Sequence, residues 1–238
     1  MQRTALIQQI ISKKKYKNYL EIGCQYGMSF LPTVCRNKIA VDPAFDIPLK
    51  RKFKWLIKNP TNIRNRYFEE TSDEFFAKRK SELEKYGKLD LAFVDGLHTF
   101  EASLKDVLNS LHYLQDDGII IMHDCFPPHK AGAVPAKNYD DAASMNLPGW
   151  DGLWCGDVWK SIVYLKKAFG EQLDVYVIDT DFGLGIVKPK QKITTSLDLD
   201  RKLFDEVNQL TYDEMMINPQ DMLGLRDVKF AETLISEI

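Results

Sequence analysis

Two short apolar runs in this chain are each followed by residues that could do acid–base or metal chemistry. Asp95 and His98 follow the first run, and His123 and Asp124 follow the second. Carboxylates are the hard oxygen ligands that divalent cations such as Mg²⁺ prefer. An imidazole has an ordinary pKa near ~6.5, so it can accept or donate a proton at neutral pH. If the four side chains met in space, they would form a candidate catalytic or metal-binding site.

A β-α-β unit would bring these side chains together. Residues 91–94 and 119–122 are apolar throughout, which indicates strands buried on both faces of a parallel sheet. Between them, apolar residues recur at helical spacing: Leu104, Val107, Leu108, Leu111 and Leu114. Adjacent parallel strands present their carboxyl ends on one edge of the sheet, where open α/β sheets bind their ligands. The sequence therefore predicts a ligand site at this edge.

A pair of glycines follows an earlier predicted strand, residues 18–22. Gly23 and Gly27 lie in the turn before a helix that we expect to run to about Arg36. Glycine permits a tight turn in which the backbone comes close to a ligand. The next predicted strand ends in Asp42, 21 residues after Glu21. Nucleotide-binding α/β folds place a ribose-binding carboxylate at about this offset.

Taken in order, these motifs resemble class I S-adenosylmethionine-dependent methyltransferases. The resemblance rests on Glu21-x-Gly23-x-x-x-Gly27-x-Ser29, Asp42, Asp95-Gly96-x-His98 and His123-Asp124, between Tyr19 and Pro189. It is closer to the metal-dependent small-molecule and sugar O-methyltransferases, such as those acting on macrolide sugars. Their motif also lacks the middle glycine of the common G-x-G-x-G form, where this chain has Gln25. The resemblance implies a Rossmann-like α/β fold: a mostly parallel seven-stranded sheet with an antiparallel last strand and helices on both faces.

The resemblance also implies a site for the methyl donor, S-adenosylmethionine. Its implied residues are Glu21, Gly23, Gly27, Ser29, Asp42, Ser72 and Asp95. Ser29, near a helix N-terminus, would help to hold the donor's carboxylate. Asp42 would accept both ribose hydroxyls, and Ser72 would face the adenine. Singly, each residue also fits a plain structural role as a turn or a helix cap.

On the acceptor side the resemblance implies His98 as the general base, with Asp95 as a second catalytic residue. Asp95, Asp124 and His123 are the predicted metal ligands, and Mg²⁺ or Mn²⁺ is the candidate ion. Several relatives carry an acid where this chain has His123, so His123 could instead orient Asp124 or favour a softer ion such as Zn²⁺. We expect the acceptor to be a small molecule with a sugar or polyol hydroxyl.

Composition narrows the other partners. The 34 acidic and 32 basic residues give a net charge of -2, so we expect neither nucleic acid nor a membrane as a partner. The first residues lack the apolar core of a signal peptide, so we expect a cytoplasmic protein. The four cysteines show no C-x-x-C spacing, which favours free thiols. A basic cluster would meet an anionic substrate or, more commonly, form a solvated face: Lys50, Arg51, Lys52, Lys54 and Lys58.

We expect a single domain over residues 1–238. Residues 126–156 are long and rich in Pro, Gly and Asp, which favours a substrate lid. Residues 67–69 are the expected third strand, and Ser72 is the expected N-cap of a helix to about Tyr86. A hairpin is expected around residues 180–182. Residues 196–238 are expected as a helical C-terminal extension that packs on the domain or on a second subunit of a homo-oligomer.

Rival functions fit less well. A nicotinamide-dependent oxidoreductase would carry G-x-G-x-x-G spacing, which residues 23–27 lack, and would not be expected to end in a hairpin. A nucleic-acid methyltransferase would be more basic and would carry a motif of the N-P-P-Y type. A non-catalytic protein that binds S-adenosylmethionine for regulation is the remaining alternative. Against it, four polar groups gathered at one sheet edge would be costly without a use.

Overall fold

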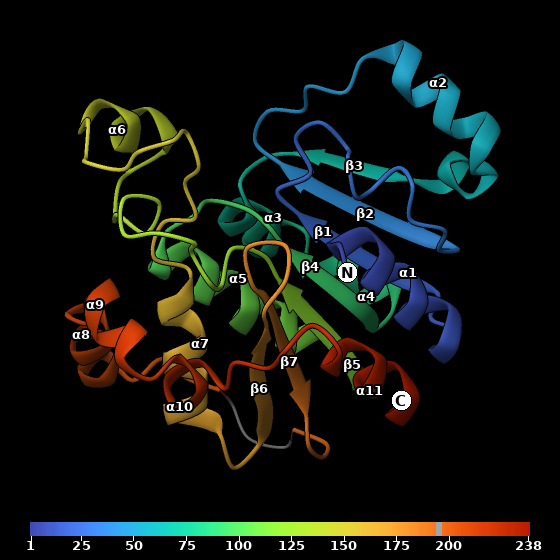
Figure 1. The fold of residues 1–238 in the computed structure, drawn as a ribbon. Helices are drawn as coiled ribbons and strands as arrows, with labels where there is room; N and C mark the ends of the chain where they lie inside the picture. Colours follow the sequence, from blue (N-terminus) through green and yellow to red (C-terminus); the bar gives the residue numbers. More distant parts are fainter. Residues whose placement is uncertain (194–196) are drawn as a thin grey trace.

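The computed structural model describes residues 1–193 and 197–238 and contains one seven-stranded sheet covered by helices on both faces (Figure 1). The strands are β1 (Asn18–Ile22), β2 (Asn37–Asp42), β3 (Arg66–Glu69), β4 (Leu89–Val94), β5 (Leu114–Met122), β6 (Leu173–Ile178) and β7 (Leu184–Pro189). Their order is β3-β2-β1-β4-β5-β7-β6. Strands β1 to β5 pair in parallel, whereas β7 is antiparallel to both β5 and β6. The predicted fold class is confirmed.

The helices divide between the two faces of the sheet. They are α1 (Arg3–Lys14), α2 (Leu49–Lys58), the 3-10 helix η1 (Pro60–Arg64), α3 (Ser72–Lys78), α4 (Lys80–Tyr86), α5 (Phe100–Tyr113), α6 (Tyr139–Ser144), α7 (Trp159–Phe169), α8 (Arg201–Asn208), α9 (Tyr212–Ile217), α10 (Pro219–Leu223) and α11 (Phe230–Glu237). No helix in the described part of the chain is long and apolar enough to cross a membrane.

Strand β4 shows why the central runs are apolar throughout. All six of its residues are buried. Ala92 and Val94 belong to the core formed with α5 and α7, whereas Leu91 and Phe93 belong to the core formed with α1 and α11. Successive side chains of a strand point to opposite faces, so a strand covered on both sides needs no polar alternation. All four cysteines are buried free thiols, as expected.

The helix predicted after Gly27 is wrong, because residues 25–32 form successive turns. Pro32 has no N–H to donate, and Gln25 and Gly27 adopt positive φ angles of 29° and 66°. Side chains from outside the segment donate hydrogen bonds to its carbonyl groups instead. The Lys38 ammonium donates to the carbonyl of Phe30 at 2.7 Å, and Asn59 donates to that of Leu31 at 3.0 Å.

Two further helix predictions need correction. The N-cap of α3 is Thr71, not Ser72: its hydroxyl accepts from the Glu74 N–H, and Glu74 completes a capping box. The expected single helix to Tyr86 is split at Arg79 into α3 and α4. The C-terminal segment consists of four short helices; Ser196, at its expected start, lies outside the described residues.

The predicted hairpin of β6 and β7 is confirmed, with Ile178 paired to Leu184. Its turn is tight, since Asp181 and Phe182 have φ angles of 50° and 62°. The C-terminal segment packs on the domain: Phe204 of α8 stacks on Phe100 of α5, with ring centroids 4.4 Å apart.

Candidate active site at the carboxyl edge of the sheet

A cavity of about 1000 Å³ lies at the carboxyl ends of the parallel strands. Sheet pairing continues for one residue past three of these strands. Gly23 donates its N–H to Val41, Asp95 to Ile22 and His123 to Val94. The first polar residues after β4 and β5 are therefore held in register at one edge. Most of the predicted site residues line this cavity: Gly23, Asp42, Ser72, Asp95, His98, His123 and Asp124.

The four polar side chains predicted to converge do so. Nε2 of His98 lies 3.2 Å from Oδ2 of Asp124 and 3.6 Å from Oδ1 of Asp95. Nδ1 of His123 lies 3.1 Å from each of these two oxygens, Oδ1 of Asp95 and Oδ2 of Asp124. Burial opposes ionisation of Asp95, but the adjacent His123 and His98 hold the pKa of Asp95 well below its usual range. Asp95 is thus held as an anion, and each of the two carboxylates contacts two imidazoles.

His98 has a defined orientation. Its Nδ1 lies 2.8 Å from the backbone carbonyl of Trp154, and a carbonyl can only accept, so Nδ1 carries a hydrogen. Nε2 is thereby directed at the two carboxylates. Burial lowers the pKa of His98, but the hydrogen bond to Asp95 and the charge of Asp124 outweigh it and raise the pKa to about 9.

The segment 126–156 reaches the cavity through His98. The rings of His98 and Trp154 lie 5.5 Å apart. Gly156 has a φ of 60°, and a Cβ there would lie 1.8 Å from the carbonyl oxygen of His98. Only glycine allows the two backbones to pass so closely. Tyr139 of α6 also lines the cavity, so the segment forms part of its wall.

Arg3 and Asp181 also contact the histidine cluster, and neither was predicted from the sequence. Nη1 of Arg3 donates to Oδ1 of Asp181 at 2.9 Å and lies 3.0 Å from Nε2 of His123. Burial lowers the pKa of His123, but the charge of Asp95 and the hydrogen bonds to Asp124 and Asp181 outweigh it and raise the pKa to about 12. The backbone N–H of Arg3 also donates to Asp181, at 2.7 Å. The only signal in the sequence was the hairpin turn that contains Asp181.

On the β1–β2 side, the backbone fixes the site. Asp42 is buried, and its two oxygens accept from the N–H groups of Gln25 and Ala44, both at 2.8 Å. Gly23 has a φ of 83°, and a Cβ there would lie 1.8 Å from the carbonyl oxygen of Asp95. Ser72 hydrogen-bonds to Asp106, and burial raises the pKa of Asp106 to about 7.

Glu21, Gly27 and Ser29 do not line the cavity, although the sequence analysis placed them in the site. Ser29 donates its hydroxyl to Glu21 at 2.6 Å, and the Tyr19 hydroxyl also donates to Glu21. Burial raises the pKa of Glu21 to about 7, and these two hydrogen bonds oppose the rise. In this arrangement the hydrogen bond from Ser29 to Glu21 ties the loop of residues 25–32 to strand β1.

One group of side chains could hold a metal ion. Asp95, His98 and Asp124 each offer one ligand atom, and these atoms all lie within 4.8 Å of one another. Two carboxylate oxygens and an imidazole nitrogen suit Mn²⁺ or Zn²⁺ as well as Mg²⁺. His123, predicted as a ligand, is not in this group, since its two nitrogens face the carboxylates and Arg3.

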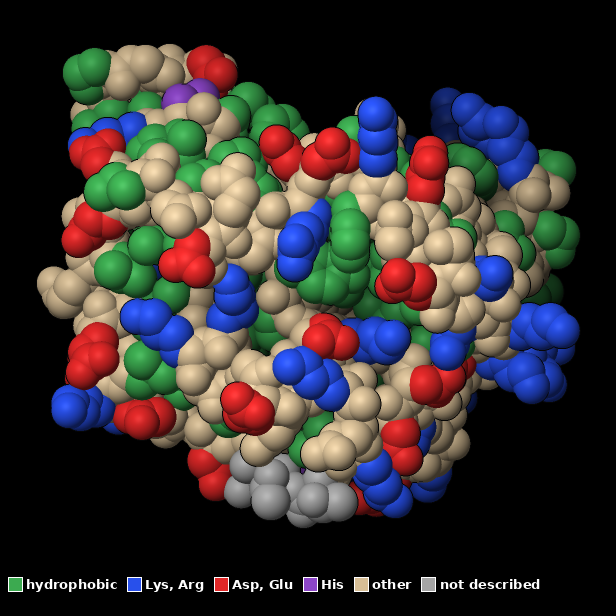
Figure 2. Space-filling view, turned by 60° about the horizontal axis from the view of Figure 1, so that its bottom comes forward, with side chains coloured by type: hydrophobic (Ala, Val, Ile, Leu, Met, Phe, Trp, Pro, Cys, Tyr) green, Lys and Arg blue, Asp and Glu red, His purple; other side chains and the backbone are tan. Residues whose placement is uncertain are grey.

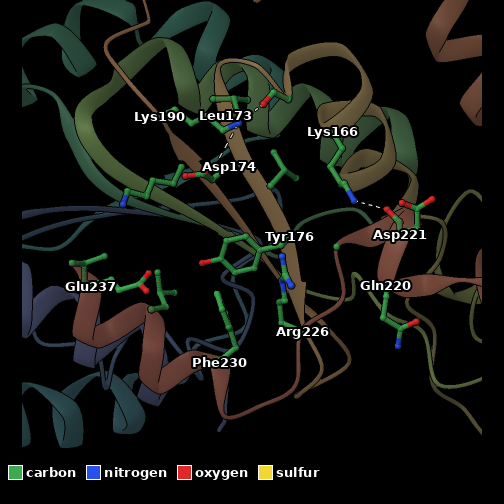
Figure 3. A pocket seen from close by; sticks show the side chains of 16 residues that line it. Lys166, Leu173, Asp174, Tyr176, Lys190, Gln220, Asp221, Arg226, Phe230 and Glu237 are labelled. Carbon is green, nitrogen blue, oxygen red and sulfur yellow. Dashed lines mark hydrogen bonds and ion pairs between the residues drawn. The ribbon is translucent and has the colours of Figure 1, made fainter.

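A second cavity, of about 470 Å³, lies beside the edge strand β6 (Figure 3). Tyr176, Arg226 and Phe230 point into it, and Lys166 donates to the Asp221 carbonyl at its rim. Histidine does not occur among the described residues that line it, and it shares no lining residue with the first cavity. Its lining therefore lacks the cluster of imidazoles and carboxylates found at the carboxyl edge of the sheet.

Comparison with known proteins identifies the fold. Residues 20–125 match the model of a protein family described as a methyltransferase domain. No curated protein matches the chain significantly. One similar solved structure is a putative O-methyltransferase from Klebsiella pneumoniae, with 14% identity, a TM-score of 0.54 and 79% of each chain covered. A putative caffeoyl-CoA O-methyltransferase from Staphylococcus aureus has 18% identity and a TM-score of 0.53, with 78% of this chain and 82% of that one covered.

An S-adenosylhomocysteine-bound methyltransferase from Podospora anserina has 18% identity and a TM-score of 0.51, with 79% of this chain and 78% of that one covered. These likenesses show the fold, and the domain match covers β1 to β5, the strands that carry the cavity. The architecture is the Rossmann-like methyltransferase fold, and residues 20–125 carry a methyltransferase domain.

Proposed function

We propose that the chain transfers the methyl group of S-adenosylmethionine to a hydroxyl oxygen of a small molecule, a sugar or another polyol. The observation that carries this proposal is the orientation of His98, whose Nε2 faces the Asp95–Asp124 pair while its Nδ1 is held by the Trp154 carbonyl. The names of the structural neighbours, several of them O-methyltransferases, support oxygen as the acceptor atom.

The donor would lie across the carboxyl ends of β1, β2 and β3. Asp42 would accept the ribose hydroxyls at the end of β2, and Ser72, after β3, would face the adenine. The amino-acid portion would cross Gly23, which would place the sulfonium near Asp95. We define the donor half as the cavity lining at Gly23, Asp42 and Ser72. It also includes the carboxyls of Glu21 and Asp106, which support this lining.

The acceptor would lie on the other side, which we call the acceptor half: Arg3, Asp95, His98, His123, Asp124 and Asp181. The acceptor oxygen bonds to the methyl carbon as the carbon–sulfur bond breaks, and the electron pair of that bond remains on sulfur as S-adenosylhomocysteine forms. The hydroxyl proton passes to Nε2 of His98 when this nitrogen is unprotonated, either above its pKa of about 9 or when a bound cation would lower that pKa. Residues 126–156, through Trp154, would cover this half and exclude water.

Asp95 and Asp124 fit a divalent cation, because their carboxylate oxygens lie within 4.8 Å of each other and the pKa of Asp95 is held well below its usual range. When bound there, a cation would lower the pKa of the acceptor hydroxyl and of His98. We assign His98 as the base and not as a third ligand, because one nitrogen cannot bind a metal and accept a proton at once. His123 then orients the carboxylates through Nδ1.

Calorimetric titration with S-adenosylhomocysteine tests the donor site. Wild-type protein should bind it with micromolar affinity, Asp42→Ala should not, and Asp46→Ala, at an exposed acid nearby, should bind normally. A screen of diols and sugars, with and without Mg²⁺ or Mn²⁺, then tests transfer. No binding by folded wild type would refute the proposal. Binding without transfer to any hydroxyl would favour a non-catalytic donor-binding protein.

A further inference from the structure

Helix α2 presents an apolar stripe to solvent. Leu49, Phe53 and Ile57 are 82%, 66% and 68% exposed. Their spacing of four residues places them in a row along one side of the helix. None of the residues of α2 is buried. In the ribbon the helix stands out beyond the β3 side of the sheet (Figure 1). A row of large aliphatic and aromatic side chains in this position has no role in the core.

The same segment is strongly basic. Between residues 47 and 68 the chain carries Lys50, Arg51, Lys52, Lys54, Lys58, Arg64 and Arg66, and no acidic residue. Lys50, Lys54 and Lys58 also follow at intervals of four, so they form a second row beside the apolar one. Lys and Arg side chains and hydrophobic side chains gather at the right-hand rim of the molecule, where α2 lies (Figure 2).

The inner side of α2 is fixed to the domain, which keeps the stripe facing outward. Trp55 packs against the core that contains α1. Arg51 donates to the Tyr26 carbonyl at 2.9 Å, and the Lys52 ammonium lies 4.5 Å from the centre of the Tyr67 ring. Tyr26 lines the candidate active site. The apolar and basic rows are therefore held next to the site cavity.

We propose that α2 docks on an anionic membrane surface. The Leu49, Phe53 and Ile57 side chains enter the boundary between headgroups and acyl chains, while Lys50, Lys54 and Lys58 face the lipid phosphates and carboxylates. A second copy of this chain is a poorer occupant, since two α2 helices face to face would bring like charges together. Nucleic acid would leave the aliphatic row without a partner.

This inference revises the expectation of no membrane partner. That expectation rested on the net charge of the whole chain, which averages the basic segment with acids elsewhere. Electrostatic attraction to a lipid surface falls off within about a Debye length, so the local charge of the docking segment decides it. Docking of α2 would bring the mouth of the cavity to the surface.

Co-sedimentation of the full chain with lipid vesicles tests the proposal. Wild type should bind vesicles of phosphatidylcholine mixed with phosphatidylserine, and binding should weaken as salt rises. The variants Phe53→Ser and Lys54→Gln should each reduce the partition coefficient, and the pair together by at least about tenfold. Ile217→Ser, at an 82% exposed isoleucine on α9, is the matched control and should bind as wild type does.

Three results would overturn the proposal: no binding by wild type, equal binding by the α2 variants, or equal binding to vesicles without phosphatidylserine. Self-association measured by light scattering and lost in Phe53→Ser, without vesicle binding, would assign α2 to a second copy instead. Because these residues are exposed, the variants should fold normally. Unchanged titration with S-adenosylhomocysteine would verify this, and it keeps the test independent of the proposed acceptor.

Discussion

The two halves of the cavity hold their acids in opposite ways. In the donor half, burial raises the pKa of Glu21 and of Asp106 to about 7. In the acceptor half, the pKa values of Asp95 and Asp181 lie well below their usual range, although burial opposes this, because His123 and other cationic or hydrogen-bonding groups face them. The donor half is thus built from backbone geometry and neutral hydrogen bonds. The acceptor half is built from charge.

The largest effect should come from removing the proposed base of the acceptor half. His98→Gln keeps a donor that can reach the Trp154 carbonyl but has no basic nitrogen. The rate of S-adenosylhomocysteine formation with an acceptor found in the screen should fall by roughly 10²- to 10⁴-fold. The affinity for S-adenosylhomocysteine should not change. His112→Gln, at an exposed histidine of α5, is the control. Equal rates in the two variants would remove His98 from the chemistry.

In the donor half, a steric conflict in the backbone should lower the stability of the protein. In Gly23→Ala the new Cβ would lie 1.8 Å from the Asp95 carbonyl, and the φ of 83° disfavours any side chain. We expect the free energy of unfolding to fall by about 3 kcal/mol, from backbone strain and displacement of the β4 end. Gly149→Ala is the matched control, since Gly149 has a φ of 82° but no atom within 4 Å of its Cβ position.

Urea unfolding followed by circular dichroism measures both variants. Gly149→Ala should lose only about 1–2 kcal/mol, the cost of the left-handed conformation. If the two glycine variants lost the same amount, the contact with the Asp95 carbonyl would not matter. A larger loss for Gly23→Ala would show that the donor half depends on close approach of two backbones.

The halves should also differ in their response to pH. The native state holds a proton on Glu21 up to a pH of about 7, whereas its ordinary pKa is 4.5. Between these values the native state binds more protons than the unfolded chain, so its stability falls as pH rises. Glu21→Gln should lessen that fall by on the order of 3 kcal/mol. A slope of the same sign from Asp106 should remain.

Unfolding free energies measured near pH ~5 and pH ~7.5 give the slope. Glu84→Gln, at an exposed acid on α4, should leave it as in wild type. An unchanged slope in Glu21→Gln would mean that Glu21 is ionised in the native protein throughout this range.

The sequence alone predicted the structural features that arise within short segments of the chain. The β-α-β unit from Leu91 to Met122 follows from periodicity, and parallel pairing then brings Asp95 and Asp124 to one edge. Asp42 and Gly23 follow from spacing within one strand–turn–strand unit. The terminal hairpin follows from two apolar runs around a short polar turn. These features depend on residues that lie close together in the chain or on strand order alone.

What the sequence could not show depends on tertiary contacts. The helix predicted after Gly27 does not form, because Lys38 and Asn59, from other elements, donate hydrogen bonds to carbonyl groups of that segment. Ser29 has the right position in its motif, but its hydroxyl is directed to Glu21. Arg3 and Asp181 are 178 positions apart, and no periodicity links them. The apolar row of α2 has helical spacing, yet only the fold shows that nothing in the described chain covers it.

The Arg3–Asp181 pair offers the smallest but most specific test of the acceptor half. Arg3→Gln removes the guanidinium that joins Asp181 to His123, and should lower the free energy of unfolding by about 1–2 kcal/mol. Arg201→Gln removes an exposed arginine paired with Asp205 at 3.7 Å, and should cost less than about 0.5 kcal/mol. In a double-mutant cycle with Asp181→Asn, the two changes should be less than additive, because each removes the same contact. Additive losses would mean that Arg3 and Asp181 stabilise the protein independently, and that the acceptor half does not depend on the N-terminal helix for its charge network.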